Sequence, residues 1–382
     1  MPKKIVYIVN SLYQDDYMSQ LIGNKINWLA EHSDYDIYLL LTEEEKKKKA
    51  IVELSPKVHV TNLALNFHEL DNRFLLWKIC NKWNRQRKYK SALNGLLKKE
   101  KPEIIVSLLG HEIEFINQIK TKGHIFAEIH DSIASYIKWG NGNTHDWLKK
   151  VIVYIEQIKL ALKLKKIKTF VVDTDEACNE WNGIFKNVHV IHNPLISSIE
   201  DKRDTPEKIV LAVGDFHPSS GYEHLIEAWR RIIPRYQEWR LRLYGNGDMQ
   251  PYKQLIKNYK LSKSVYCYAL EQDMENIYAR TSIFVHTLNS DRFGQRIMEA
   301  QSFGIPCIAF DTPYGPKDLI KNEENGFLLY NKRITDLSCK LGILMRNDDL
   351  RNKMEQNTLK RNETFHLDHI MEEWKSLFEQ AT

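Results

Sequence analysis

Short apolar runs recur along the first half of the chain and alternate with segments whose apolar residues have helical spacing. The runs predict strands at residues 4–9, 36–41, 58–60, 104–109, 125–129, 169–172 and 188–191. Helices are predicted between them, for example over residues 18–31 and 111–120. Apolar strands separated by helices are typical of a parallel, doubly wound sheet, whose ligands bind at the carboxyl ends of the strands.

The second half repeats this alternation. Strands are predicted at residues 209–213, 241–244, 265–268, 283–286, 305–310 and 326–329, and an amphipathic helix over 222–233. The pattern therefore predicts an N-terminal domain over residues 1–196, a polar linker over 197–207 and a C-terminal domain over 208–364. A final helix over 365–382 carries Ile370, Trp374 and Phe378 on one face, which requires a partner surface.

Composition supports two cytoplasmic α/β domains. A chain of 382 residues with 43% hydrophobic side chains is too long to fold around one small core. No uninterrupted apolar run approaches the length of a membrane span. The N-terminus leads directly into a predicted strand, so no signal peptide is expected. The five cysteines are scattered without CxxC spacing, which favours reduced thiols over a disulfide framework or a metal site.

The net charge is +5, from 55 basic and 50 acidic side chains, but two segments are strongly basic. Residues 73–101 and 147–168 combine lysine and arginine with leucine or aromatic residues. Two interpretations stay open: solvated lysine faces on surface helices, or a patch that contacts anionic lipid headgroups. Nucleic acid is not expected as a partner, because no binding motif accompanies the charge.

Residues 287–304 form the segment with the clearest candidate chemistry. A strand ends at His286, polar residues follow, and a helix is predicted to begin near Phe293, with Ser290 or Asp291 as its cap. Such a helix start binds anions through free backbone N–H groups. Asp291 and Glu299 would accept hydrogen bonds from sugar hydroxyls beside that anion. The alternative is an ordinary strand–helix unit with a solvated Asp and a surface Glu.

The ordered motifs of residues 209–345 resemble the donor domain of the retaining GT-B glycosyltransferases, in particular the group 1 (family 4) enzymes of bacterial capsule, O-antigen and lipopolysaccharide synthesis. The matching stretches are Val-Gly at 213–214, Leu-Tyr-Gly-Asn-Gly at 243–247, Asp-Arg-Phe-Gly at 291–294, Glu-Ala at 299–300 and Phe-Gly-Ile-Pro at 303–306. The resemblance implies two Rossmann-like domains that face each other across a cleft. It also implies a C-terminal helix that crosses back to the N-terminal, acceptor-binding domain.

The resemblance also implies roles for individual residues. Glu299 would hold the ribose hydroxyls of a nucleotide sugar, and Asp291 and His130 would act on the donor sugar. Donor-binding positions would be Gly214, Gly245, Phe293, Gly294 and Gln295. No metal and no separate cofactor are expected, since the donor substrate itself, a UDP-sugar in our interpretation, carries the nucleotide.

Two positions depart from the family pattern. The usual diphosphate-binding Arg and Lys are replaced by Asp215 and Ser220. Because charge develops on the leaving diphosphate, another cation should compensate for this loss. Arg292, Arg296, His217 and Lys317 are the nearby candidates, and Arg296 is preferred because it lies in the first turn of the predicted helix and an arginine can hold phosphate through two bonds.

The sequence therefore predicts a glycosyltransferase that moves a hexose to a saccharide or lipid-linked saccharide in surface polysaccharide synthesis. It is expected in the cytoplasm, with peripheral contact at the inner face of the membrane as an open possibility. An alternative with the same fold is a donor-binding or scaffold subunit without activity, which Asp215 and Ser220 favour. A sugar-nucleotide epimerase is a further alternative, which the Asp291 and Glu299 pattern disfavours.

Overall fold

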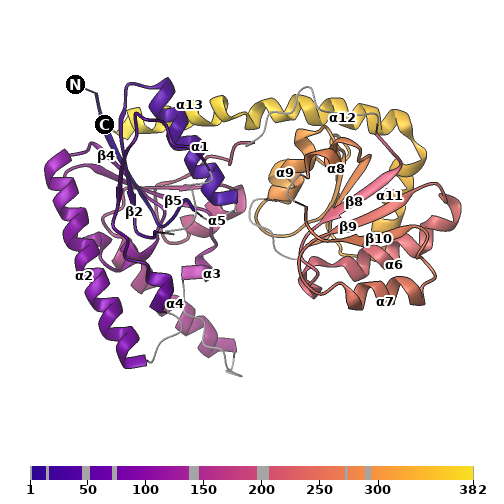
Figure 1. Ribbon diagram of the computed structural model, residues 1–382, viewed down its shortest axis with the longest axis horizontal. Helices are drawn as coiled ribbons and strands as arrows, with labels where there is room; N and C mark the ends of the chain where they lie inside the picture. The colour runs from indigo at the N-terminus through magenta and orange to yellow at the C-terminus, as the bar shows by residue number, and fades with distance from the viewer. Residues whose placement is uncertain are drawn as a thin grey trace. The chain divides into compact units, whose positions relative to one another are not determined.

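The computed structural model describes residues 2–13, 17–44, 52–70, 75–136, 146–195, 206–271, 274–288 and 294–381. They form two compact units, which are described separately (Figure 1). Unit 1 comprises Met1–Ile196 and Leu367–Thr382, and unit 2 comprises Ser197–His366. Each unit contains one sheet in which all neighbouring strands pair in parallel, so the predicted pair of Rossmann-like domains is confirmed.

The sheet of unit 1 has the strand order β3-β2-β1-β4-β5-β6-β7. Its strands are β1 (Lys4–Val9), β2 (Asp36–Leu41), β3 (His59–Asn62), β4 (Ile104–Ser107), β5 (His124–Ile129), β6 (Thr169–Val172) and β7 (Val188–Val190). Its α-helices are α1 (Tyr17–His32), α2 (Leu75–Glu100), α3 (Ile133–Tyr136), α4 (Asp146–Leu164), α5 (Asp175–Asn182) and α13 (Leu367–Ala381). Central strands are buried on both faces, which explains why they are continuous apolar runs in the sequence.

Helix α13 follows unit 2 in the sequence but belongs to unit 1. It lies alongside α1 (Figure 1), and the Trp28 indole N–H of α1 donates a hydrogen bond of 2.6 Å to Asp368 of α13. Trp374 and Phe378 are buried, and the Phe378 ring packs edge-on against Phe126 of β5 at 5.1 Å. The predicted return of the C-terminal helix to the N-terminal domain is therefore confirmed.

The sheet of unit 2 has the order β10-β9-β8-β11-β12-β13. Its strands are β8 (Ile209–Val213), β9 (Arg240–Tyr244), β10 (Val265–Tyr268), β11 (Ile283–His286), β12 (Cys307–Phe310) and β13 (Gly326–Leu329). Its α-helices are α6 (Tyr222–Ile232), α7 (Gln250–Asn258), α8 (Glu275–Ala279), α9 (Gln295–Ser302), α10 (Pro316–Leu319), α11 (Ile334–Arg346) and α12 (Asp348–Asn362). Trp229 of α6 and Trp239 before β9 lie fully buried in one core with Leu341 of α11.

The helix predicted over residues 111–120 is wrong. The segment forms two short 3₁₀ turns, η2 (His111–Glu114) and η3 (Ile116–Gln118). Phe115 separates them with φ −139° and ψ 6°, which is outside the helical region. Apolar residues three apart satisfy a 3₁₀ turn as well as an α-helix, so their spacing alone does not distinguish the two. Further 3₁₀ turns are η1 (Phe67–Leu70), η4 (Pro218–Ser220), η5 (Ile233–Arg235) and η6 (Glu363–Phe365).

Candidate active site

The strand order of unit 2 reverses direction between β8 and β11. In doubly wound sheets this switch point leaves a crevice at the carboxyl ends of the two strands, where ligands bind. Gly214 directly follows β8, and Thr287 and Leu288 follow β11. The topology therefore brings Gly214 and the start of the 287–304 segment to the same edge of the sheet.

Two glycines at this edge permit a close approach of backbone segments. A Cβ atom on Gly245 would lie 1.7 Å from the Gly214 carbonyl oxygen, so no other residue fits there without a backbone shift. The Tyr222 hydroxyl shares its one proton between the carbonyl oxygens of Gly214, at 3.0 Å, and Tyr244, at 2.8 Å. The ends of β8 and β9 are thus held together beside the switch point.

Helix α9 begins at Gln295, and its N-cap is Gly294 in the left-handed conformation, with φ 65°. The predicted cap at Ser290 or Asp291 is therefore wrong. Gly294 has no side chain to cap the helix, so within the described residues the first N–H groups of α9 have no N-cap side chain and form a place where an anion can bind. Asp291, Arg292 and Phe293 lie outside the described residues.

Glu299 lies on α9 with its carboxylate fixed by three neighbouring side chains. The Tyr278 hydroxyl of α8 donates to Glu299 Oε2 at 2.9 Å, and the Gln295 amide donates to Oε1 at 2.8 Å. Arg296 Nη1 lies 3.0 Å from Oε1 and 2.8 Å from Oε2. The Glu299 and Arg296 side chains are each 28% exposed, so this oriented carboxylate remains accessible to a ligand.

Asp215 and Ser220, the two positions that depart from the family pattern, are joined by a hydrogen bond that closes a loop. Ser220 is buried, and its hydroxyl donates to the carbonyl oxygen of Asp215, whereas the Asp215 side chain is exposed. Lys317 Nζ lies 3.2 Å from Asp311, and the exposed His217 accepts the Ser219 N–H through Nδ1 at 3.2 Å. Among the described candidates for a replacement cation, Arg296 alone lies on α9.

In unit 1, His130 follows β5 and lies between two carboxylates. Its Nε2 is 3.1 Å from Glu128, and its Nδ1 is 3.4 Å from Asp173, which follows β6. Glu128 also forms a buried ion pair with Lys25 of α1. Burial alone lowers the pKa of His130, but Asp173 and Glu128 outweigh it and raise the pKa to about 9. The two carboxylates therefore favour the protonated form of His130.

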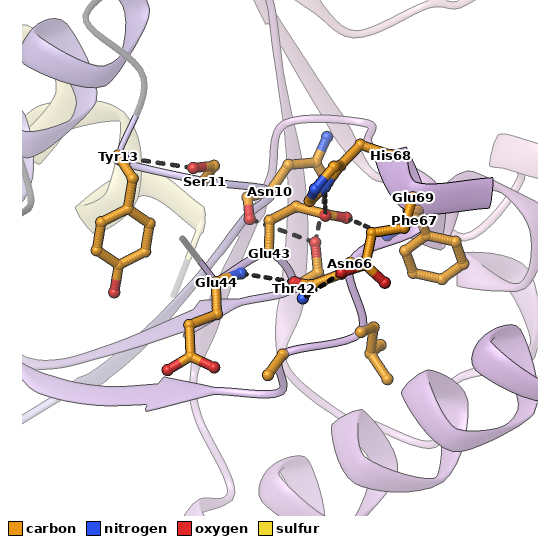
Figure 2. A network of polar contacts seen from close by, with 12 residues as sticks. Asn10, Ser11, Tyr13, Thr42, Glu43, Glu44, Asn66, Phe67, His68 and Glu69 are labelled. Atoms are coloured by element: carbon orange, nitrogen blue, oxygen red, sulfur yellow. Dashed lines mark hydrogen bonds and ion pairs between the residues drawn. The ribbon is translucent and has the colours of Figure 1, made fainter. Parts of the chain in front are cut away.

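A second polar cluster lies where β1, β2 and β4 of unit 1 end, which is the switch point of that sheet. Glu43 accepts hydrogen bonds from the Phe67 backbone N–H at 2.9 Å and from His68 Nδ1 at 2.6 Å. The His111 ring stacks on Phe67 at 4.0 Å. Figure 2 shows Asn10 and His68 gathered around the carboxylate of Glu43. His68 is 58% exposed and His111 37%, so a ligand can reach both.

The predicted site residues that the structure describes are distributed over both units. Gly214, Gly245, Gly294, Gln295, Arg296 and Glu299 belong to unit 2, whereas His130 belongs to unit 1. The partners of His130 were not predicted, although a Glu inside an apolar strand is a signal for a buried polar network. In the described part of the chain, no group of three or more His, Cys, Asp or Glu side chains is arranged to hold a metal ion.

Residues 197–361 match the family model described as glycosyl transferases group 1. An uncharacterized glycosyltransferase of Haemophilus influenzae is 28% identical over 201 residues, which cover 52% of this chain and 57% of that protein. The poly(ribitol-phosphate) alpha-N-acetylglucosaminyltransferase of Staphylococcus aureus is 24% identical over 272 residues, covering 65% of this chain and 54% of that protein. The chain thus spans about half the length of these two curated relatives.

The fold is that of solved GT-B enzymes. TarM of S. aureus, crystallised with fondaparinux, alpha-GlcNAc-glycerol and UDP, superposes with a TM-score of 0.73 at 16% identity, covering 98% of this chain and 99% of TarM. At this identity the likeness establishes the fold alone. The GT-B architecture predicted from the sequence is confirmed.

Proposed function

We propose that this chain, whose residues 197–361 match the group 1 glycosyl transferases, moves a hexose from a UDP-sugar to a hydroxyl of a saccharide or lipid-linked saccharide in bacterial surface polysaccharide synthesis. The observation that carries the proposal is the oriented, accessible carboxylate of Glu299 on a helix whose start is open to an anion. UDP as the nucleotide is supported by its presence in the TarM crystals.

In this proposal the ribose hydroxyls donate to Glu299, and the diphosphate lies at the first N–H groups of α9. The ribose would then replace Arg296 as the partner of the carboxylate. The released guanidinium is within reach of the helix start, because Arg296 is the second residue of α9. Arg296 would thereby supply the positive charge that Asp215 and Ser220 lack, and stabilise the leaving diphosphate.

The reaction proposed is transfer with retention at the anomeric carbon. The bond between that carbon and the diphosphate oxygen breaks, the acceptor oxygen bonds to the carbon on the same face, and the acceptor proton passes to the leaving diphosphate. Positioning and electrostatic stabilisation would supply the rate acceleration. Asp291, which lies outside the described residues, remains our candidate for holding the donor sugar. The proposal requires no metal.

We assign the acceptor to the switch point of unit 1, at the cluster of Glu43, His68 and His111. Its exposed groups are hydrogen-bonding imidazoles beside an aromatic ring. Such a combination suits the hydroxyls and apolar faces of a sugar or polyol. This location also follows the general rule for ligands of doubly wound sheets.

A donor panel tests the proposed function. The purified chain would be titrated with UDP- and GDP-sugars in a calorimeter, and nucleotide release would be followed in parallel. Binding and slow hydrolysis of one UDP-hexose are expected. Binding without release, even with acceptors present, would favour the scaffold function that Asp215 and Ser220 suggest. Absence of binding to every donor would contradict the assignment of Glu299.

Helix α4 carries a feature that favours a lipid-linked acceptor. Val151, Ile155, Ile158 and Leu162 form one stripe along it, and each is at least 44% exposed. Lys159 beside the stripe is 59% exposed, although it pairs with Glu156. An apolar face flanked by lysine suits the surface of an anionic membrane. No helix in the described part of the chain is both long and apolar enough to cross a membrane.

The Ile155→Ser, Ile158→Ser double variant is expected to weaken binding to phosphatidylglycerol vesicles at least tenfold. Each buried isoleucine contributes about 1.5–3 kcal/mol when it leaves water, and about 1.4 kcal/mol corresponds to tenfold. Sedimentation with vesicles measures the change, and Tyr330→Ser, at an exposed position of unit 2, is the control. Equal binding of both variants would contradict membrane contact through α4. Equal binding of the unmodified chain to neutral phosphatidylcholine would contradict the preference for an anionic membrane.

A further inference from the structure

Four charged side chains lie buried together at the carboxyl edge of the unit 1 sheet. Lys25 comes from α1, Glu128 from β5, His130 from the residue after β5 and Asp173 from the residue after β6. The side chains of Lys25 and Glu128 are 2% exposed, Asp173 is 7% exposed and His130 is 9% exposed. Charges buried to this extent are stable only when they are balanced and hydrogen-bonded.

The two buried carboxylates of this cluster require two positive charges for balance. Glu128 and Asp173 supply two negative charges. Burial lowers the pKa of Lys25, but Glu128 and Asp173 favour its charged form, so Lys25 supplies one positive charge. The second positive charge comes from His130, whose two ring nitrogens each face one of the carboxylates. A neutral imidazole has only one N–H to donate, whereas the imidazolium donates from both nitrogens. The geometry therefore fits a charged His130 with both N–H groups directed into the protein.

Three further polar side chains lie around the cluster. The Tyr7 hydroxyl on β1 is uncharged, because burial and the nearby Glu128 raise its pKa. His192 hydrogen-bonds through Nδ1 to the backbone oxygen of Asp173 at 2.8 Å. The Asn193 amide donates to the Asp173 carboxylate at 3.4 Å. Lys25 is thus the cation that contacts Glu128 in addition to His130.

Helix α13 holds this lysine in place. The Lys25 ammonium lies 4.1 Å from the centroid of the Trp374 ring, which is the distance of a cation–π contact. Trp374 is itself buried against unit 1. The Lys25 ammonium therefore contacts the Glu128 carboxylate and the Trp374 ring of α13 in the interior of unit 1.

We infer that Lys25 is a positioning residue of the candidate active site: by keeping Glu128 ionised, it preserves the carboxylate that, together with Asp173, holds His130 as a doubly hydrogen-bonded cation. The role of His130 toward a donor sugar rests on the proposed function, but its charge and orientation do not. With both N–H groups committed to Glu128 and Asp173, His130 neither accepts nor delivers a proton during the reaction. It contributes a fixed positive ring at the end of β5.

Lys25→Met tests the charge while keeping an unbranched, apolar side chain of similar length. We expect a clear fall in the urea midpoint of unit 1, because Glu128 and Asp173 then share one cation. Lys25→Met combined with Glu128→Gln removes one charge of each sign and should recover a large part of that fall. Lys4→Met is the matched control, since Lys4 pairs with Glu100 in the same unit but is 32% exposed.

The protonation of His130 is measured by the NMR signals of ¹³C-labelled histidine in the unmodified chain. We expect a midpoint near pH 9 instead of near 6.5. A raised pKa stabilises the folded state fully below the unfolded value, so this contribution is lost as the pH rises from about 6.5 through 9. Glu128→Gln should lower the His130 midpoint by about one pH unit or more, because it removes a hydrogen-bonded charge.

Two results would overturn the inference. One is a His130 midpoint near 6.5 in the unmodified chain. The other is a double variant no more stable than Lys25→Met alone, which would show that Lys25 contributes packing and not charge balance. Neither measurement uses a donor or an acceptor. A failure of the proposed glycosyl transfer would therefore appear in the donor panel and leave these results unaffected.

Discussion

Glu299→Ala is expected to reduce donor binding and glycosyl transfer at least about 100-fold. A hydrogen bond to a charged group contributes about 1.5–3 kcal/mol, and two ribose hydroxyls would lose their acceptor together. The reduction should be seen in donor affinity as well as in turnover, because the ribose is bound before and during the reaction. Calorimetry with the donor that the unmodified chain binds, together with nucleotide release, measures both.

The fold should survive this change. Alanine is the best helix former, and the Glu299 side chain is 28% exposed, so no fully buried charge is left behind. Glu227→Ala is the matched control: Glu227 also lies on a helix of unit 2 and pairs with arginines three and four residues away. It should bind the donor normally. Donor affinity unchanged in Glu299→Ala would remove the ribose assignment.

Trp374→Ala is expected to destabilise unit 1 by about 3–5 kcal/mol, the usual cost of truncating a buried aromatic side chain. Trp374 is 1% exposed and packs with Phe378 in the core that α13 shares with α1. Its loss would also remove the aromatic partner of Lys25. The effect should be confined to unit 1, although residue 374 follows the whole of unit 2 in the sequence.

Hydrogen exchange separates the two units in one experiment. Amides of β1 and β4 should exchange much faster in Trp374→Ala, while those of β8 and β11 serve as the internal reference. Leu359→Ala, at a position 39% exposed on α12, is the control for loss of an apolar side chain. Similar acceleration in both sheets would mean that α13 does not stabilise unit 1 specifically.

The sequence predicted the central strands well because they are largely buried on both faces. β1, β2, β8 and β11 begin and end at the predicted residues, since a change from apolar to polar side chains coincides with each strand end. The edge strand β3 is shifted by one or two residues from its prediction, and its side chains are largely exposed. Where burial is partial, the apolar pattern no longer fixes the boundaries.

Of the candidate site, the residues that are close in the sequence could be predicted together, and those from distant segments could not. Gly294, Gln295 and Glu299 lie within one helix and its cap, so their spacing in the sequence already places them together. The partners of His130 come from elements far apart: Lys25 and Glu128 are separated by 103 residues. No local sequence pattern indicates that Lys25 and Glu128 are in contact. Only the presence of charged residues inside apolar segments indicated that some buried network was needed.

The assignment of α13 to unit 1 has a consequence for how the chain is made. Trp28 and Asp368 contact each other across 340 residues, so the ribosome must complete all of unit 2 before the helix that covers α1 emerges. Until then, the apolar face of α1 and the Lys25–Glu128 pair lack their cover. Translation that stops anywhere within unit 2 leaves this face exposed, where chaperones and proteases recognise it. Unit 1 is thus closed only after unit 2 has been synthesised.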